Sequence, residues 1–157
     1  SLMNPPNADP TITPRRRVGY ASGAFDLLHV GHLRYLAAAA AQCERLLVGI
    51  PDDAIVARVK GRPPTTPQAE RLEMIAGFAC VARALPVAVS MDETERFAAF
   101  LRGLDVDAVF IGEAWSETPR WARLRPVLEA SGIAVVFLPH TPGISSTLIK
   151  ERAAGSR

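Results

Sequence analysis

The stretch GAFDLLHVGH, Gly23–His32, organises the whole chain. Residues 17–21 (RVGYA) before it are short and apolar enough for a buried strand, and apolar residues recur at helical spacing from Leu33 to Ala40 after it. The stretch is therefore predicted to form a strand-to-helix turn, with Gly31 and His32 near the start of the helix.

A turn of this kind suits an anion, because free backbone N–H groups and the positive end of the helix dipole meet there. His29 and His32 are three positions apart and can reach the same ligand, and Gly31 has no Cβ to keep a phosphate away from the backbone. Imidazolium N–H donors aimed at a phosphoryl group would stabilise a transition state without a covalent intermediate. Two ordinary surface histidines at a helix N-terminus are the alternative interpretation.

A second motif, HTPGISST at His140–Thr147, precedes another helical stretch near the end of the sequence. The hydroxyls of Ser145, Ser146 and Thr147 can cap a helix or donate to a phosphate. The HxGH of the first motif and this second motif resemble the two signatures of the cytidylyltransferase-like nucleotidyltransferases, in which the second usually reads RTEGISTT. The resemblance runs from about residue 17 to residue 153 and is greatest toward the glycerol-3-phosphate cytidylyltransferases.

The alternation of strands and helices predicts an α/β domain with a doubly wound parallel sheet. The expected strands are residues 17–21, 46–50, 83–89, 108–111 and 133–138, and helices are expected at 92–102, capped by Asp92, and at 121–130. The resemblance implies a Rossmann-like, three-layer arrangement with strand order 3-2-1-4-5. We expect one nucleotidyltransferase domain over residues 17–157, after a flexible arm, residues 1–16, that begins with an expression scar.

In such a sheet, ligands bind at the carboxyl edge where the strand order reverses, here between the first and fourth strands. The resemblance implies that His29, His32 and Lys60 are catalytic. It implies nucleotide-binding roles for Gly23, Ala24, Phe25, Asp26, Gly31, Arg62, Gly112, Trp115, His140, Thr141, Gly143, Ile144, Ser145, Ser146 and Thr147. Trp115 could stack on a base or a sugar, or simply pack beneath the adjoining loop.

The basic stretch RVKGRPP at residues 58–64 is expected to be a flexible loop that closes over phosphates. The resemblance implies that Lys60 and Arg62 contact the nucleotide phosphates and the acceptor, whereas composition alone would make Lys60 a solvated charge. Arg96 is a candidate acceptor-binding residue by the same resemblance, and an exposed helix cation otherwise.

The activity that the resemblance implies is transfer of CMP from CTP to a small phosphorylated or phosphonate acceptor, such as glycerol 3-phosphate, with release of pyrophosphate. A Mg²⁺ ion would be held through the nucleotide phosphates, with no metal site made of protein side chains. One alternative is an adenylyltransferase that uses ATP on a sugar phosphate. Another is a catalytically silent nucleotide-binding module.

The chain departs from the family pattern at five positions. His140 replaces an arginine, Ala24 a threonine and Ala114 an aspartate, while Ala79 and Ala82 stand where relatives carry arginine and aspartate. These departures leave the acceptor and the base open.

Composition agrees with one globular domain, since apolar residues make up 48% and charged residues 22% of 157. A net charge of +2 does not indicate a nucleic-acid partner. Cys43 and Cys80 are expected to be reduced core residues of a cytoplasmic protein, and no apolar run approaches the roughly 20 residues of a membrane span. The resemblance also implies a homodimer, with the helix around Arg71 as a reasonable interface.

Overall fold

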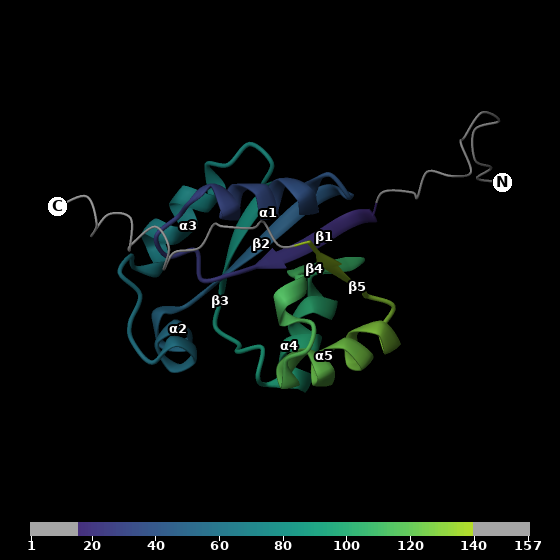
Figure 1. Cartoon of the computed structure of the whole chain (residues 1–157). Coiled ribbons are helices and arrows are strands. Elements are labelled where there is room, and N and C mark those ends of the chain that lie inside the picture. The colour runs from purple at the N-terminus through teal and green to yellow at the C-terminus, as the bar shows by residue number, and fades with distance from the viewer. Residues whose placement is uncertain (1–15, 140–157) are drawn as a thin grey trace, which may run out of the picture.

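The computed structural model describes residues 16–139, which form one α/β domain around a five-stranded parallel sheet (Figure 1). The strands are β1 (Arg16–Ser22), β2 (Cys43–Pro51), β3 (Arg83–Val87), β4 (Ala108–Gly112) and β5 (Ala134–Leu138). The helices are α1 (Val30–Ala40), α2 (Asp53–Lys60), α3 (Gln68–Ala76), α4 (Thr94–Gly103) and α5 (Pro119–Ala130), with a short 3₁₀ helix at Glu113–Trp115. The strand order is β3-β2-β1-β4-β5, which confirms the predicted topology.

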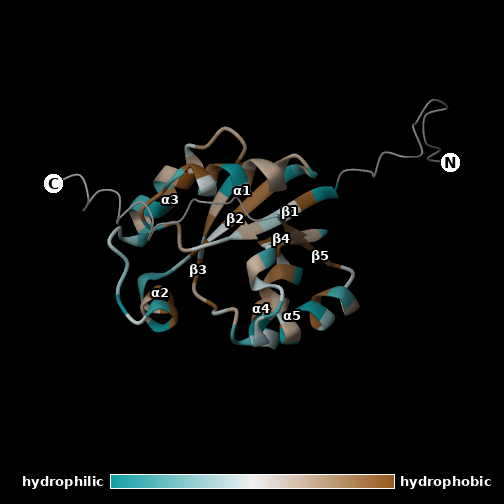
Figure 2. Ribbon diagram, viewed as in Figure 1, coloured by the Kyte–Doolittle hydropathy of each residue, from teal (hydrophilic) through white to brown (hydrophobic). Residues whose placement is uncertain are grey.

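Helices cover both faces of the sheet. Helices α1 and α3 lie on one face, and α4 and α5 on the other (Figure 1). The sheet is apolar between them (Figure 2), and each face has its own core. Leu36 and Ile75 belong to one core, whereas Phe97, Leu101 and Trp121 belong to the other. The three-layer arrangement follows from this burial of both faces of the parallel sheet.

Strand β1 is central and sets the position of the crevice. It pairs in parallel with β2 on one side, where Tyr20 lies opposite Leu47, and with β4 on the other, where Tyr20 lies opposite Val109. The chain therefore winds in opposite directions from β1, which opens a crevice at the carboxyl ends of β1 and β4.

Helix α2 corrects part of the expected loop over residues 58–64, because residues 58–60 form its last turn and only residues 61–64 lie outside a helix. The Asp52 carboxylate caps the helix by accepting from Ile55 N–H at 2.8 Å. Gly61 ends it in the left-handed region, at φ 76°, and donates its N–H to Ala57 C=O at 2.8 Å. Buried Ile55 and Val56 give the segment an apolar side, which the neighbouring glycine and prolines obscured in the sequence.

Two helix starts also differ from the prediction. Helix α4 begins at Thr94, because Asp92 forms an ion pair with Arg120 at 2.9 Å instead of capping the helix. Helix α5 begins at Pro119, so that Pro126 lies inside it. Proline suits the first turn of a helix, where its missing N–H would have no partner.

Three further expectations concern the ends and surfaces of the domain. Strand β1 includes Arg16, whose N–H donates to Gln42 C=O at 2.9 Å, and so begins one residue before the predicted strand. Cys43 is buried and Cys80 is half-buried, and no disulfide joins them. Across residues 16–139, none of the helices has the length and hydropathy needed to cross a membrane.

Candidate active site

The turn between β1 and α1 has an unusual backbone. Phe25 and Leu27 both adopt left-handed conformations, with φ of 52° and 54°. Side chains other than glycine rarely adopt this region, and such strain concentrates at functional sites. Phe25 is 2% exposed and packs over Gly23, where a Cβ would lie only 3.1 Å from the Phe25 ring. Residues 23–25 therefore form a tight turn in which the buried Phe25 ring covers Gly23.

The two histidines of the turn cap α1 together. His29 is the N-cap residue, and its Nδ1 accepts from Gly31 N–H at 3.1 Å. His32 completes a reciprocal capping box, because its Nδ1 accepts from His29 N–H at 3.1 Å. The ring centroids lie 4.0 Å apart. The prediction that His29 and His32 lie side by side at the helix start is therefore confirmed by the geometry.

These hydrogen bonds assign the tautomer of each ring. A nitrogen that accepts a hydrogen bond carries no proton, so each neutral imidazole has its proton on Nε2. Nε2 is the ring nitrogen that the cap leaves unused. The caps therefore hold both rings in a fixed orientation and leave one N–H donor on each ring for a ligand.

Burial keeps the pair neutral in the free protein. Burial, together with the nearby charges of His29 and Lys60, lowers the pKa of His32 to about 4. Burial also lowers the pKa of His29 from its ordinary value. The rings accordingly meet a ligand at pH 7 as neutral N–H donors rather than as the imidazolium donors that we expected.

Asp26 links this turn to the segment that leads into α3. Its carboxylate accepts from Thr65 N–H at 2.8 Å and from Thr66 N–H at 2.9 Å. Burial by itself raises the pKa of Asp26, but these hydrogen bonds and the nearby Lys60 bring it below the ordinary value. Asp26 is thus an ionised carboxylate that positions backbone.

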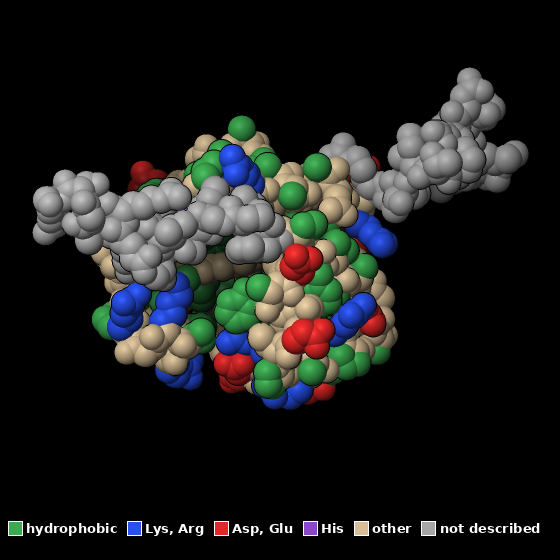
Figure 3. Space-filling model, viewed as in Figure 1, with side chains coloured by type: hydrophobic (Ala, Val, Ile, Leu, Met, Phe, Trp, Pro, Cys, Tyr) green, Lys and Arg blue, Asp and Glu red, His purple; other side chains and the backbone are tan. Residues whose placement is uncertain are grey.

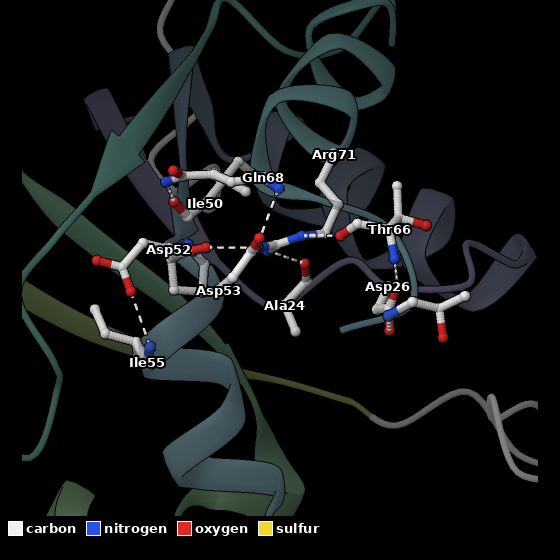
Figure 4. A network of polar contacts seen from close by, with 11 residues as sticks. Ala24, Asp26, Ile50, Asp52, Asp53, Ile55, Thr66, Gln68 and Arg71 are labelled. Carbon is white, nitrogen blue, oxygen red and sulfur yellow. Dashed lines mark hydrogen bonds and ion pairs between the residues drawn. The ribbon is translucent and has the colours of Figure 1, made fainter. Parts of the chain in front are cut away.

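Arg71 joins three parts of the site, as Figure 4 shows. The side chain is 0% exposed, and its guanidinium donates to the carbonyls of Thr66 at 2.9 Å, Ala24 at 2.8 Å and Pro51 at 2.9 Å. It also forms an ion pair with Asp53, at 2.7 Å. The sequence interpretation placed Arg71 on a helix face and in a possible interface, and missed this role. A cation among the apolar positions of that helix was the available signal.

A pocket with a volume of about 160 Å³ lies at the predicted edge of the sheet. The ends of β1 to β4, one side of α2 and the start of α5 form its walls. Figure 3 shows the hollow, with Lys and Arg side chains gathered on the α2 side. Of the predicted site residues, Gly23, Ala24, Lys60 and Trp115 line it.

The other predicted residues within the described range are not among those that line this pocket. His29, Gly31 and His32 are at the neighbouring helix start, and Lys60, which lowers the pKa of His32, connects them electrostatically to the pocket. Arg62 is exposed just beyond α2. Arg96 forms an ion pair with Glu93 on its own helix, at 2.5 Å, and the structure does not bring it into the pocket.

Trp115 is presented to solvent at the end of β4. It follows Gly112 in the 3₁₀ helix and is 46% exposed. The Arg120 guanidinium lies 5.8 Å from the centroid of its ring, a cation–π distance. The alternative that Trp115 packs beneath a loop does not fit this exposure.

The second motif, His140, Thr141, Gly143, Ile144, Ser145, Ser146 and Thr147, lies outside the described residues, and its roles remain predictions. Between residues 16 and 139, no three His, Cys, Asp or Glu side chains gather in a group that could hold a metal ion.

Comparison with known proteins bears on both motifs. A family described as cytidylyltransferase-like matches residues 20–152. The chain is 32% identical over 140 residues to the bifunctional protein HldE of Bradyrhizobium diazoefficiens, across 88% of this chain and 27% of that protein. It is 36% identical over 132 residues to the protein of the same name from Halorhodospira halophila, across 83% of this chain and 26% of that protein. The chain thus spans about a quarter of the length of these relatives.

A solved structure agrees with the fold. The lipopolysaccharide core biosynthesis protein from Thermoplasma volcanium superposes with a TM-score of 0.63 and 25% identity, across 80% of this chain and 97% of that one. The family match includes the histidine turn, the basic end of α2 and the second motif. On these grounds, the chain belongs to the cytidylyltransferase-like nucleotidyltransferase family.

Proposed function

We propose that this chain transfers a nucleoside monophosphate from a nucleoside triphosphate to a small phosphorylated acceptor and releases pyrophosphate. The observation that carries the proposal is the histidine cap of α1. Two imidazoles, each with a free Nε2–H, are fixed at a helix N-terminus beside a pocket at the switch point of the sheet. Family membership supports the same reaction class.

The chemistry is an in-line displacement. An oxygen of the acceptor phosphate attacks the α-phosphorus of the triphosphate, a new P–O bond forms, and the bond to the β-phosphate oxygen breaks. No side chain needs to act as a nucleophile, because an ionised phosphate monoester is one already. The protein positions the reactants and stabilises the charge that develops on the phosphoryl oxygens.

Each basic group has a proposed part in this step. His29 and His32 donate from Nε2 to the α- and β-phosphate oxygens, and Lys60 holds the attacking phosphate at the pocket wall. Arg62 contacts the nucleotide phosphates. Asp26 and Arg71 keep the turn and the start of α2 in place.

We assign the leaving pyrophosphate to the second motif, where Thr141 and the hydroxyls of residues 145–147 would bind it beside His140. A Mg²⁺ ion would be held by the oxygens of the triphosphate rather than by protein side chains. It would supply charge neutralisation on those oxygens.

CTP is the first candidate donor, because the GEAW sequence at the end of β4 and the GIS of the second motif resemble the cytidylyltransferases. Trp115, exposed beside the pocket, is the proposed base contact. ATP with a sugar phosphate is the second candidate, favoured by the likeness to a lipopolysaccharide core biosynthesis protein. Lipopolysaccharide cores are built from sugars, which agrees with a sugar phosphate as the acceptor.

Pyrophosphate release tests the proposal directly. The chain is incubated with Mg²⁺, each of the four nucleoside triphosphates and a panel of phosphorylated polyols, sugars and phosphonates. Turnover with one triphosphate identifies the donor, and turnover with ATP alone would replace the first candidate by the second. Binding of a triphosphate without turnover on any acceptor would instead indicate a silent nucleotide-binding module.

A further inference from the structure

Trp115 follows the end of β4, and the turn after it fixes its backbone. The Trp115 carbonyl accepts hydrogen bonds from Thr118 N–H at 3.1 Å and from Thr118 Oγ1 at 2.6 Å. The indole passes beside Gly112, where a Cβ would lie 3.7 Å from Trp115 Cδ1. The side chain lines the pocket and is exposed, so its ring is available to a ligand.

Arg120 lies over this ring. Its guanidinium is 5.8 Å from the centroid of Trp115, which is within cation–π distance. Arg120 belongs to the first turn of α5 and also lines the pocket. A guanidinium covers one face of an indole and leaves the opposite face for another planar group.

Asp92 holds the guanidinium in place. Its carboxylate accepts from Arg120 Nε at 2.9 Å and from Arg120 Nη2 at 3.1 Å, so the ion pair is bidentate. The Asp92 N–H donates in turn to Oγ of the buried Ser90, at 3.1 Å. The hydrogen bonds from Arg120 keep the pKa of Asp92 below its ordinary value, although burial opposes them. The pair therefore stays charged at pH 7 and joins the segment between β3 and α4 to the start of α5.

A second arginine of α5 offers a comparison. The Arg125 guanidinium lies 5.3 Å from the centroid of Phe137 and forms an ion pair with Glu129, one helical turn along, at 2.9 Å. Phe137 packs against the core and does not line the pocket. The Arg125 side chain is 52% exposed, whereas that of Arg120 is 17% exposed. The more firmly held guanidinium thus lies over the ring that a ligand can reach.

We propose that Asp92 and Arg120 are positioning residues for the nucleobase: Asp92 holds Arg120 against one face of Trp115, and the base of the triphosphate stacks on the other face. This inference rests on the proposed nucleotidyl transfer, in which Trp115 is the base contact. An unsupported indole would lose rotamer freedom when a base binds, and a ring held in advance avoids that cost. Because Asp92 neutralises Arg120, this arginine acts through Trp115 and does not bind a phosphate.

The contribution of the base is measured by comparing triphosphates with and without one. Dissociation constants of CTP, ATP and inorganic tripolyphosphate are determined by isothermal titration calorimetry in the presence of Mg²⁺. The constant for tripolyphosphate is divided by the constant for the tighter of the two nucleotides. This base ratio reports the contacts to the nucleoside, because the phosphate contacts are common to both ligands.

Three variants should lower the base ratio and leave the constant for tripolyphosphate unchanged. Trp115→Leu should lower the ratio about tenfold or more, because the stacking surface is lost. Asp92→Asn and Arg120→Met should each lower it about threefold, because the ring is no longer held. In both, KM for the triphosphate should rise by the same factor with kcat unchanged, as expected when only binding is weakened. Glu129→Gln, which releases Arg125 at the other ring, is the matched control and should leave the ratio unchanged.

The opposite results are equally distinct. A weaker constant for tripolyphosphate in Arg120→Met would make Arg120 a phosphate ligand and overturn the inference, as would an unchanged base ratio in Asp92→Asn. If the unmodified chain binds nucleotides no more tightly than tripolyphosphate but releases pyrophosphate, the inference fails and nucleotidyl transfer stands. If none of the three ligands binds, the proposed function itself is refuted.

Discussion

Two strand-to-helix junctions at the same edge of the sheet have opposite chemistry. At β1–α1, two histidines cap the helix, its first turn has no acidic residue, and the backbone before it is strained. At β2–α2, Asp52 caps the helix and Asp53 follows in the first turn. Both junctions present a helix N-terminus, but only a neutral or positive one can accept a phosphate.

The β1–α1 junction is therefore suited to binding a phosphate, whereas the β2–α2 junction holds neighbouring parts of the chain in place. Two carboxylates would repel a triphosphate at α2, whereas the Asp53 carboxylate there holds Arg71. The histidine caps perform the same structural task at α1 without adding negative charge. A cap residue therefore decides what a helix N-terminus can bind, in addition to whether the helix forms.

The largest effect is expected when Arg71, which holds the β2–α2 junction in place, is replaced. Arg71→Met should lower the free energy of unfolding by about 3 kcal/mol or more, because three backbone carbonyls lose the guanidinium as donor and Asp53 loses its ion pair. Urea denaturation measures this. Arg125→Met, which breaks an exposed pair with Glu129, is the control and should cost about 0–1 kcal/mol. Equal losses in both variants would mean that the contacts of Arg71 add nothing to the stability of the fold.

The next effect separates capping from catalysis at α1. His29→Asn keeps a side-chain oxygen that can cap the helix but lacks the Nε2 donor. We expect kcat to fall about 100-fold, equivalent to about 2.7 kcal/mol, with little change in the unfolding midpoint. His29→Ala should lose both rate and stability. Full turnover in His29→Asn, with triphosphate binding intact, would remove the imidazole from the mechanism.

The pH dependence of stability gives a smaller and more specific signal. The pKa of His32 is about 4 in the folded chain and near 6.5 when unfolded. Between these values the unfolded chain binds more protons, so lowering the pH from 7 toward 4 destabilises the fold. Comparing unfolding free energies of the unmodified chain and His32→Gln at pH 7 and pH 5 isolates this contribution. The variant should lose less stability on acidification; an equal loss would mean that His32 is not buried as described.

The smallest effect is expected at the β2–α2 junction. Asp52→Ala removes the cap of α2 and should cost about 1 kcal/mol of stability. Because α2 is assigned no phosphate contact at its N-terminus, kcat should stay within about threefold, less than 1 kcal/mol of barrier. Stopped-flow pyrophosphate release measures this rate. A fall in kcat as large as that of His29→Asn would erase the distinction between the two junctions.

The sequence predicted the features that local patterns determine. The strands and the histidine turn followed from the pattern of apolar runs, whereas the strand order followed from the resemblance carried by HxGH. Helix α2 was missed because Gly61 and the prolines after it outweighed the short apolar face of Ile55 and Val56. Propensity is a weak guide when a helix is only two turns long.

The parts of the site that depend on distant contacts could not be predicted. Arg71 bonds to Ala24 and Pro51, which lie far from it in sequence, and no periodicity indicates those partners. Asp92 was misassigned as a cap for the same reason, because Arg120 binds it across the fold.

Helix α2 connects the buried Arg71 contact to Lys60. It is anchored at Asp53 by the Arg71 ion pair and has Lys60 at its far end, about 11 Å away at 1.5 Å per residue. A tilt of 10° about the anchored end would carry Lys60 by about 2 Å, enough to make or break a hydrogen bond to a phosphate. The Arg71–Asp53 contact at one end of α2 therefore determines how accurately Lys60 is positioned at the other end.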